Sequence, residues 1–204
     1  PKDHADEYVI RFQNVWKELN IEYDDFIRTT EKRHTERVKD VLKILFKQGD
    51  IYLDEYEGLY SVSEERFITE KEFKTGQFRN IKKINEKNYF FKMSKYQKQL
   101  IEYILNNPNF IQPTSRKNEI LGFLKKPLND LCISRPKSRL SWGVEIPFDD
   151  DYVTYVWVDA LVNYISAIGW SINEVEFNRL WPADYHLMAK DIITTHAIYW
   201  STML

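Results

Sequence analysis

The side chains best suited to chemistry lie in the last third of the chain, in two successive segments. Residues 152–158 are β-branched and aromatic and predict a strand, and helical spacing from Ala160 predicts a helix that Gly169 ends. Residues 186–188 predict a second short strand, and Asp191 is expected to cap a helix that reaches the end of the chain. A strand that feeds a helix, twice in succession, is how an open α/β sheet forms a pocket at the carboxyl ends of its strands.

The concavity predicted from these segments combines aromatic, imidazole, apolar and charged side chains. The residues placed around it are Trp157, Ala160, Leu161, Tyr164, Ile192 and His196, with Lys190 and Asp191 at its lip. Spacing alone leaves a second interpretation open, in which these are ordinary core residues of a strand and two helices. In that interpretation the aspartate is a helix cap and the lysine is solvated.

The composition limits the class of protein. With 204 residues, 43% of them hydrophobic and 15% aromatic, the chain can bury a core and does not have the composition of a disordered protein. A formal net charge of −2 provides no overall basic field, so any contact with nucleic acid must come from a local patch. No apolar run approaches the length of a membrane span. The single cysteine, Cys132, excludes an internal disulfide and a multi-cysteine metal site, and it favours a reducing, cytoplasmic setting.

Upstream of these segments, hydrophobic periodicity predicts helices on either side of a β-rich stretch. The expected elements are an amphipathic helix at 3–19, a helix at 35–48 that Gly49 ends, short β-like pieces over 51–91, a helix capped by Ser94, and a helix at 115–125. The alternating pattern typical of strands returns only after Asp130. The middle of the chain is therefore interpreted as a module inserted into an α/β sheet, entered near Arg28 and left near Asp130.

Several stretches in a fixed order carry a family resemblance. They are Tyr23–Thr30, Tyr56–Tyr60, Asn88–Phe91, Asp130–Arg139, Tyr155–Tyr164 and Ala189–Trp200. Together they resemble the methionyl-tRNA synthetases, class I enzymes whose Rossmann-type catalytic domain is interrupted by a connective-peptide insertion. The resemblance implies an α/β fold in which residues 1–30 end the first catalytic half, residues 31–131 form the insertion, and residues 132–204 begin the second half.

The reaction that the resemblance implies is amino-acid activation. The methionine carboxylate attacks the α-phosphate of ATP, which acts with Mg²⁺; pyrophosphate leaves, and the methionyl group then passes to tRNA(Met). Such a displacement needs reactants held in line and developing charge stabilised, so no Ser-His-Asp or Cys-His arrangement is expected. The full-length protein would be a methionine–tRNA ligase whose partners are methionine, ATP and tRNA(Met), with no membrane attachment.

The resemblance also assigns roles to single residues. Trp157, Ala160, Leu161, Tyr164, Ile192 and His196 match positions that line the methionine side-chain pocket, and Lys190, Asp191 and Arg135 match nucleotide-binding positions. A thioether is apolar and a weak acceptor, so aromatic walls with one Tyr O–H and one His N–H suit it.

The chain departs from the family at some of these positions. Leu161 replaces the proline of some relatives, and Ala189 replaces a common glycine, which is harmless only where φ stays negative. Arg135, Lys137 and Arg139 form a small basic loop, for which a role at the ATP phosphates or the tRNA acceptor end is one interpretation; for Lys137 and Arg139, a solvated surface turn is at least as open an interpretation.

A zinc knuckle found in many relatives is expected to be metal-free here. It opens with Cys-x-x-Cys in those relatives, whereas this chain has Ser61 and Glu64 at the corresponding positions. A hydroxyl and a carboxylate without thiolates beside them are poor zinc ligands. The aromatic side chains expected to hold the knuckle instead are Tyr60, Phe67, Phe73 and Phe78.

Residues 92–95, Lys-Met-Ser-Lys, imitate an ATP-handling signature of class I synthetases. They precede the pocket segments, so we interpret Ser94 as a helix cap and Lys95 as a solvated lysine in the first turn. The true signature and the upstream His-Ile-Gly-His signature would then lie outside the chain. This fragment alone is therefore expected to be inactive.

Two other functions stay open. A synthetase for leucine, isoleucine or valine would carry an editing insertion much larger than the roughly hundred residues expected here. A non-catalytic tRNA- or protein-binding protein derived from a class I synthetase would lack both signatures in its full-length sequence.

Overall fold

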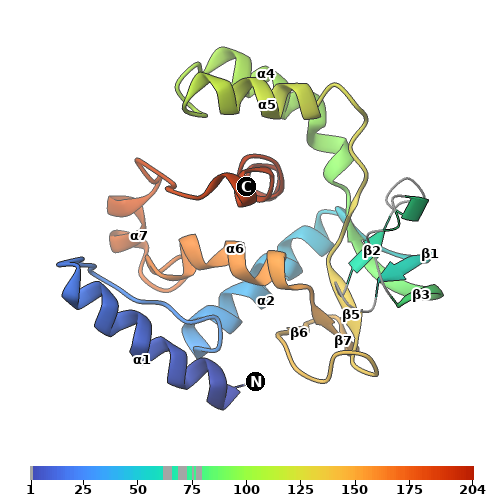
Figure 1. Ribbon diagram of the computed structural model, residues 1–204, viewed down its shortest axis with the longest axis horizontal. Helices are drawn as coiled ribbons and strands as arrows, with labels where there is room; N and C mark the ends of the chain where they lie inside the picture. The colour runs from blue at the N-terminus through green and yellow to red at the C-terminus, as the bar shows by residue number, and fades with distance from the viewer. Residues whose placement is uncertain (1, 62–65, 69–72, 75, 77–79) are drawn as a thin grey trace.

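The computed structural model describes residues 2–61, 66–68, 73–74, 76 and 80–204, and it shows a mixed α/β chain. Two helices, α2 (Lys32–Lys47) and α6 (Val156–Ser166), pack together at its centre. A β-hairpin lies beside this pair, and the helices α4 (Gln97–Asn106) and α5 (Thr114–Phe123) stand opposite the C-terminal helical segment (Figure 1). Segments far apart in sequence therefore face one another.

The α2–α6 pair forms because each helix carries an apolar stripe at helical spacing. The side chains that the pair buries are Val38, Val41, Leu42 and Leu45 from α2, and Val158, Leu161, Val162 and Ile165 from α6. Gly49 follows α2 with a φ of +76°, a left-handed conformation that glycine adopts without strain. The helix predicted at 35–48 is thus confirmed, and it begins three residues earlier than expected.

The central β-rich stretch is a long hairpin. The strands β1 (Ile51–Ser61) and β3 (Ile81–Phe91) pair antiparallel in continuous register from Ile51 opposite Phe91 to Ser61 opposite Ile81. β2 (Arg66–Ile68) and β4 (Leu131–Cys132) add to its two edges, giving the order β2-β1-β3-β4. The prediction of short pieces was wrong because charged residues interrupt the apolar pattern of both strands.

A second, smaller sheet precedes α6. It consists of β5 (Ser134–Pro136), β6 (Glu145–Ile146) and β7 (Asp149–Thr154), in the order β5-β7-β6 with antiparallel pairing. The strand predicted at 152–158 ends at Thr154, and the helix begins at Val156. Trp157 therefore lies in the first turn of α6 and not at a strand end. β-branched and aromatic residues continue into the helix, so composition alone misplaced this boundary.

The C-terminal segment is helical but irregular. α7 (Glu174–Leu180) is followed by an extended stretch, so the strand predicted at 186–188 is absent among these described residues. The chain is then helical through η2 (Lys190–Ile192), η3 (Thr195–Trp200) and α8 (Ser201–Met203). Ala189 occupies the N-cap and no side chain caps this end, so the prediction that Asp191 caps the helix was wrong.

The helical segment that begins at Met93 lacks the predicted cap. A short helical turn, η1 (Met93–Tyr96), leads into α4, and Ser94 donates its backbone N–H to Asp130 Oδ1 at 3.0 Å. Ser94 is therefore anchored by the carboxylate of Asp130, which lies 36 residues further along the chain, and its side chain caps no helix. The helix predicted at 115–125 is confirmed as α5.

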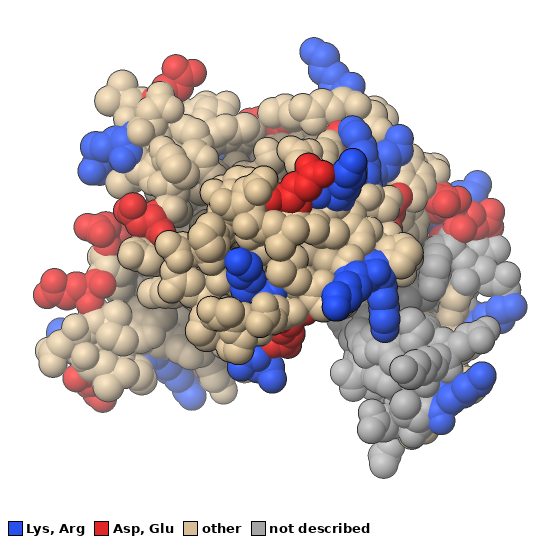
Figure 2. Space-filling view, turned by 90° about the horizontal axis from the view of Figure 1, so that it is seen from above, with Lys and Arg blue, Asp and Glu red and all other residues tan. Residues whose placement is uncertain are grey.

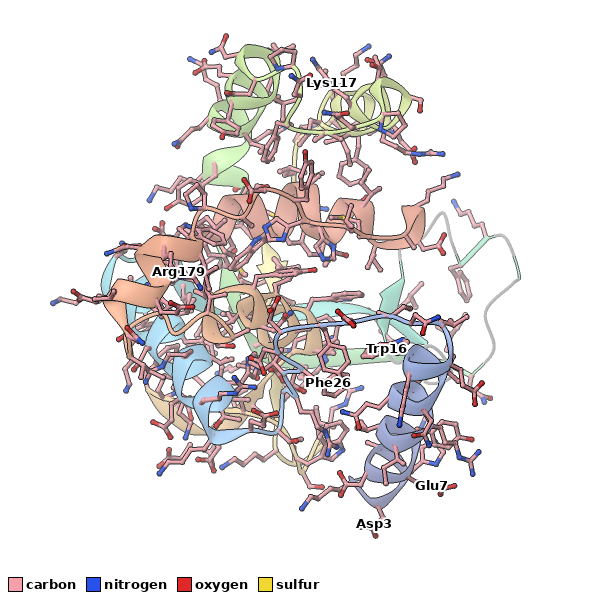
Figure 3. The ribbon with its side chains drawn as sticks, turned by 90° about the vertical axis from the view of Figure 1, so that its left-hand side faces the viewer. Asp3, Glu7, Trp16, Phe26, Lys117 and Arg179 are labelled. Atoms are coloured by element: carbon pink, nitrogen blue, oxygen red, sulfur yellow. The ribbon has the colours of Figure 1, made fainter. Side chains whose placement is uncertain are left out.

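The first helix, α1 (Lys2–Glu18), projects from the rest of the molecule (Figure 3). It was predicted to bury an apolar stripe, yet none of its residues is buried. Its contacts with the following chain include the Trp16 ring, whose centroid lies 5.4 Å from that of Phe26, and an ion pair between Asp6 and Arg28 at 2.6 Å. Within the described chain, no helix combines the length and apolar character needed to cross a membrane.

Candidate functional site

One hydrogen bond joins the two segments singled out in the sequence. The Tyr164 hydroxyl on α6 lies 2.7 Å from His196 Nε2 on the C-terminal segment. His196 Nδ1 lies 2.9 Å from the carbonyl oxygen of Ile192, one turn earlier. The predicted neighbours Tyr164, Ile192 and His196 are therefore brought together by direct contact.

The two contacts define the proton positions on His196. A carbonyl oxygen can only accept, so Nδ1 carries the hydrogen that it donates to Ile192. In the neutral ring Nε2 is then the acceptor, and the Tyr164 hydroxyl donates to it. The Tyr164 hydroxyl hydrogen is thus used by His196 Nε2 and the His196 Nδ1 hydrogen by the Ile192 carbonyl, so neither points freely at a ligand, contrary to the prediction. Burial raises the pKa of Tyr164, which favours the neutral hydroxyl that this bond requires.

An aromatic cluster surrounds the pair. The ring of His186 lies 4.4 Å from that of Tyr164 at an interplanar angle of 69°, an edge-to-face arrangement. Trp181 and Trp200 complete the cluster, with their centroids 6.3 Å apart. Burial and the nearby His196 lower the pKa of His186, so the cluster favours an uncharged ring. These surroundings suit an apolar, polarizable ligand group.

Two nitrogens in this cluster are buried without a hydrogen-bond partner among the described residues. They are Nδ1 of His186 and Nε1 of Trp200. Neither residue appeared among the predicted site residues, because a Trp and a His at these positions carry no spacing signal that separates a site from a core. Buried polar atoms usually have partners, so these two mark a place where a bound group or further chain would satisfy them.

The cluster opens into a cleft of about 1080 Å³. One wall comes from α4, the start of α5 and the loop between them; the other comes from the extended stretch and the C-terminal segment, including Lys190 and His196. Figure 2 shows both basic and acidic side chains on the face of the molecule that is seen from above.

At the start of the C-terminal segment, the backbone conformation of Ala189 is one that an alanine can adopt. Ala189 has φ −73°, so an alanine is accommodated where relatives commonly have glycine, and the condition set in the sequence analysis is confirmed. Lys190 and Asp191 are both exposed at this point, Lys190 as part of the cleft wall. They are available for polar contacts.

The other predicted pocket residues lie on α6. Trp157 and Ala160 are partly buried, and they share a helix face with Tyr164. Leu161 is only 2% exposed and belongs to the hydrophobic core. For Leu161 the structure thus favours packing against the core.

Arg135 lies away from the cleft, on β5. Its Nη1 donates to the Ser134 carbonyl at 2.7 Å and to Cys132 Sγ at 3.1 Å, and its guanidinium lies 4.4 Å from the Tyr155 ring centroid. With 7% of its surface exposed, this arginine is a buried part of the small sheet. A role toward ATP requires these contacts to change.

Lys137 and Arg139 are ion-paired. Lys137 Nζ lies 2.8 Å from a carboxylate oxygen of Glu145, and this contact raises the pKa of the lysine. Arg139 pairs with the buried Glu86 of β3. Both residues therefore lie in a surface turn, as one of the open interpretations held, and each has an ion-pair partner there.

Lys95, interpreted from the sequence as solvated, also has a defined partner. Its Nζ lies 2.6 Å from Oδ1 of Asp50, a carboxylate that is 3% exposed, and the Tyr96 hydroxyl donates to Oδ2 at 2.6 Å. The Lys-Met-Ser-Lys segment is therefore tied to the chain just after α2. The sequence contained no indication of this pair, because Asp50 and Lys95 are 45 residues apart.

Sequence reasoning also missed a buried polar cluster between α2 and α6. His34, which is fully buried, contacts Asp159 Oδ1 through Nε2 at 2.6 Å and Ser166 Oγ through Nδ1 at 2.8 Å. A Ser-His-Asp arrangement was not expected, yet these three residue types meet here. The cluster is not arranged for nucleophilic catalysis, because Ser166 is 1% exposed and cannot reach a substrate.

The knuckle predicted to be metal-free lies only partly within the described residues. Among the described residues, no three His, Cys, Asp or Glu side chains come together as a metal site. Cys132 is the only thiol in the sequence, and its Sγ accepts a hydrogen bond from Arg135. Ser61 ends β1, whereas Glu64 lies outside the described residues. The predicted aromatic packing of the knuckle also falls largely outside them; Phe73 is described and is 48% exposed.

The chain is similar to known proteins along its whole length. A family model described as tRNA synthetases class I (M) matches residues 1–80 and 75–204. Methionine–tRNA ligases of Clostridium perfringens and Clostridium acetobutylicum are 49% and 50% identical to it, over 100% of this chain and 32% of each relative. The chain thus spans about a third of the length of these curated relatives.

Solved structures with the same fold are also similar in sequence. Mycobacterium tuberculosis methionyl-tRNA synthetase bound by methionyl-adenylate has a TM-score of 0.85 and 42% identity, covering 94% of this chain and 39% of that chain. The apo form of that enzyme has a TM-score of 0.87 and 41% identity, covering 98% and 42%. The similarity to these structures therefore holds for both the fold and the amino-acid sequence.

Proposed function

The chain belongs to the class I tRNA synthetases of type M, and from this premise we propose that it is the middle part of a methionine–tRNA ligase. The full-length protein would activate methionine with ATP and transfer the methionyl group to tRNA(Met). The observation that carries the proposal is the Tyr164–His196 hydrogen bond within an aromatic cluster, in a chain that is 42% identical to an enzyme solved with methionyl-adenylate. That combination supports an amino-acid side-chain site beside a nucleotide site.

In this proposal the residues of the site position methionine and ATP, and none of them forms a covalent bond to a substrate. The methionine carboxylate attacks the α-phosphate of ATP, and pyrophosphate departs on the opposite side. Holding the reactants in line accounts for much of such an acceleration, and charge stabilisation supplies the rest. Because both nitrogens of His196 are hydrogen-bonded, to the Tyr164 hydroxyl and to the Ile192 carbonyl, the ring presents a fixed polar face to the site.

The methionine side chain would lie against the aromatic cluster. In this proposal Trp157, Ala160 and Tyr164 supply one wall from α6, and Ile192 and His196 supply the other. The thioether sulfur gains favourable contacts with aromatic rings, each of a few tenths to about 1.5 kcal/mol. Leu161 supports this wall from the core behind it.

The nucleotide would lie near the start of the C-terminal segment. Lys190 and Asp191 are exposed there, so an ammonium group can face phosphate and a carboxylate can accept ribose hydroxyls. Arg135 stays a proposed nucleotide ligand only if its contacts to Cys132 and Ser134 are exchanged for phosphate. Mg²⁺ would accompany ATP as part of the substrate, and no zinc is proposed because the chain contains a single cysteine.

The remaining parts of the proposal concern organisation and location. We place the catalytic halves at residues 1–30 and 132–204, with the insertion at 31–131. α2 lies in that insertion but packs on α6, so the insertion and the second half share a core. We place the protein in the cytoplasm, where its partner tRNA would be charged.

The test is methionine-dependent ATP–pyrophosphate exchange by the full-length protein. Exchange that requires methionine, followed by charging of tRNA(Met), is the expected result. This chain expressed alone is expected to be inactive, and leucine, isoleucine and valine are the comparison substrates. Absence of exchange with methionine, combined with tRNA binding, would instead support the non-catalytic binding protein.

A further inference from the structure

The buried His34 connects two points on one face of α6. Asp159 and Ser166 are seven residues apart, which is about two turns, so their side chains project from the same side of the helix. The imidazole lies between them, with Nε2 at 2.6 Å from Asp159 and Nδ1 at 2.8 Å from Ser166. A single rigid ring therefore fixes α6 at both ends of the interval.

The predicted methionine wall faces the other way. Trp157, Ala160 and Tyr164 lie roughly 100° to 200° around the α6 axis from Asp159, at 3.6 residues per turn. The interval from Asp159 to Ser166 contains Tyr164, whose hydroxyl donates to His196. Any rotation or sliding of α6 at its back would therefore move Tyr164 at its front.

Apolar packing alone would hold α6 only weakly at one rotational and axial position on α2. The remaining contacts between α2 and α6 come from aliphatic side chains such as Val38, Leu42 and Val162, which have no directional bonds. Hydrogen bonds made by a fully buried ring have fixed directions, and buried polar groups of this kind can fix the register between helices.

From these observations we propose that His34 and Asp159 are positioning residues for methionine binding. They set the axial and rotational position of α6, and thereby the place of Tyr164 against His196. The inference rests on the proposed function. Neither residue touches the substrate, and both act through the helix that lines its site.

The test uses the full-length protein and two variants with different predicted effects on the helix. In Asp159→Glu the carboxylate is kept but lies one methylene further from the backbone, so the bond to His34 can form only if α6 shifts. In the double variant His34→Leu with Asp159→Ala, both partners are removed and no buried group is left unpaired. Ser166 then still donates to the Asn163 carbonyl.

The expected result is a selective loss of methionine binding. In pyrophosphate exchange the KM for methionine rises about tenfold in the double variant and about threefold or more in Asp159→Glu, because small displacements of binding groups are costly. The KM for ATP stays within about twofold, since Lys190 and Asp191 are not on α6. The melting temperature of Asp159→Glu is expected to stay near that of wild type. If Asp159 served stability alone, the methionine KM of this variant would then also stay unchanged.

A matched control is the Arg33–Asp25 ion pair, which joins α2 to the loop before it at 2.6 Å. Asp25→Ala is expected to leave both KM values unchanged. Wild-type methionine KM in both test variants would overturn the inference, and if the double variant does not fold, Asp159→Glu decides alone. An inactive wild-type protein would overturn the proposed function, and the inference with it.

Discussion

Lys95 and Asp50 form an ion pair at 2.6 Å in which the lysine is 54% exposed and the carboxylate 3% exposed. Burial alone would raise the pKa of Asp50, but hydrogen bonds from Lys95 and Tyr96 lower it overall, so the carboxylate stays charged. The pair joins the end of α2 to the turn before α4. It therefore gives the Lys-Met-Ser-Lys segment a structural role, in the part of the chain that we propose to be the insertion.

Replacing Lys95 tests that role. In the full-length protein, Lys95→Ala is expected to keep pyrophosphate exchange within about threefold of wild type, because the lysine contacts no reacting group in this arrangement. The variant is expected to melt at a lower temperature, since Asp50 stays buried with one partner fewer. Exchange with saturating methionine and ATP, together with a thermal melt, measures both quantities.

Lys98→Ala is the matched control for this experiment. Lys98 is 91% exposed on α4 and pairs only loosely with Glu102 at 3.9 Å, so neither quantity is expected to change. A hundredfold loss of exchange in Lys95→Ala with the fold intact would instead identify residues 92–95 as the ATP signature. It would also overturn the proposed module boundary.

The Tyr164–His196 bond gives a second prediction. Tyr164→Phe removes the donor and leaves His196 Nε2 buried without that partner, and His196→Ala removes the other side of the bond. Each is expected to lower kcat/KM for methionine by a factor that corresponds to about 1 to 3 kcal/mol of lost transition-state stabilisation, while the KM for ATP changes little. Circular dichroism checks the fold. Unfolding of both variants would show that the pair serves the core and not a ligand.

Metal content provides a third prediction. This chain, purified, is expected to contain well under one zinc per molecule, because Ser61 and Glu64 stand where the thiolate ligands of the zinc knuckle would be. Chelators are expected to leave its melting temperature unchanged. Elemental analysis measures the first quantity, and stoichiometric zinc would contradict the metal-free knuckle.

Alkaline stability provides a fourth prediction. Burial and a 2.8 Å hydrogen bond to Asp149 raise the pKa of Tyr89 to about 12 from its ordinary value near 10. Between these two values the folded state holds a proton that the unfolded state has lost. The contribution of Tyr89 is therefore complete below pH 10 and disappears as the pH rises toward 12; it amounts to about 3 kcal/mol.

The measurement is the free energy of unfolding as a function of pH. Tyr89→Phe is expected to lose less stability than wild type between about pH 10 and pH 12, because it lacks the titrating hydroxyl. Tyr103→Phe, at an exposed position on α4, is the control and is expected to follow the wild-type curve. Equal slopes in wild type and Tyr89→Phe would contradict the assignment.

Local pattern predicted much of the fold. The helices around Val38 and Ile120 were expected from apolar spacing, and both are present as α2 and α5. The predicted boundaries between strands and helices were less accurate where the same residue types occur in both kinds of element. Val156 and Trp157 favour strands by type, yet they begin α6, because packing against α2 decides the conformation there.

The contacts within the candidate site were predicted in part, because helical spacing shows which residues share a face. Ile192 and His196 share a helix face as their spacing required, and the Tyr164 contact follows once the two segments face each other. Long-range polar contacts carry no such periodic signal. His34 meets Ser166 across 132 residues, and Asp50 meets Lys95 across 45, so only the fold shows them.

The two walls of the cleft come from residues 96–116 and 181–204, which are separate in sequence and connected by no hairpin. A ligand that contacts both walls stabilises one separation between them, and by thermodynamic reciprocity a substitution that favours that same separation is expected to raise the affinity for the ligand. Substitutions on α4 and α5, within the proposed insertion, are therefore expected to change affinity at the proposed methionine site even where they leave His196 and Tyr164 unaltered.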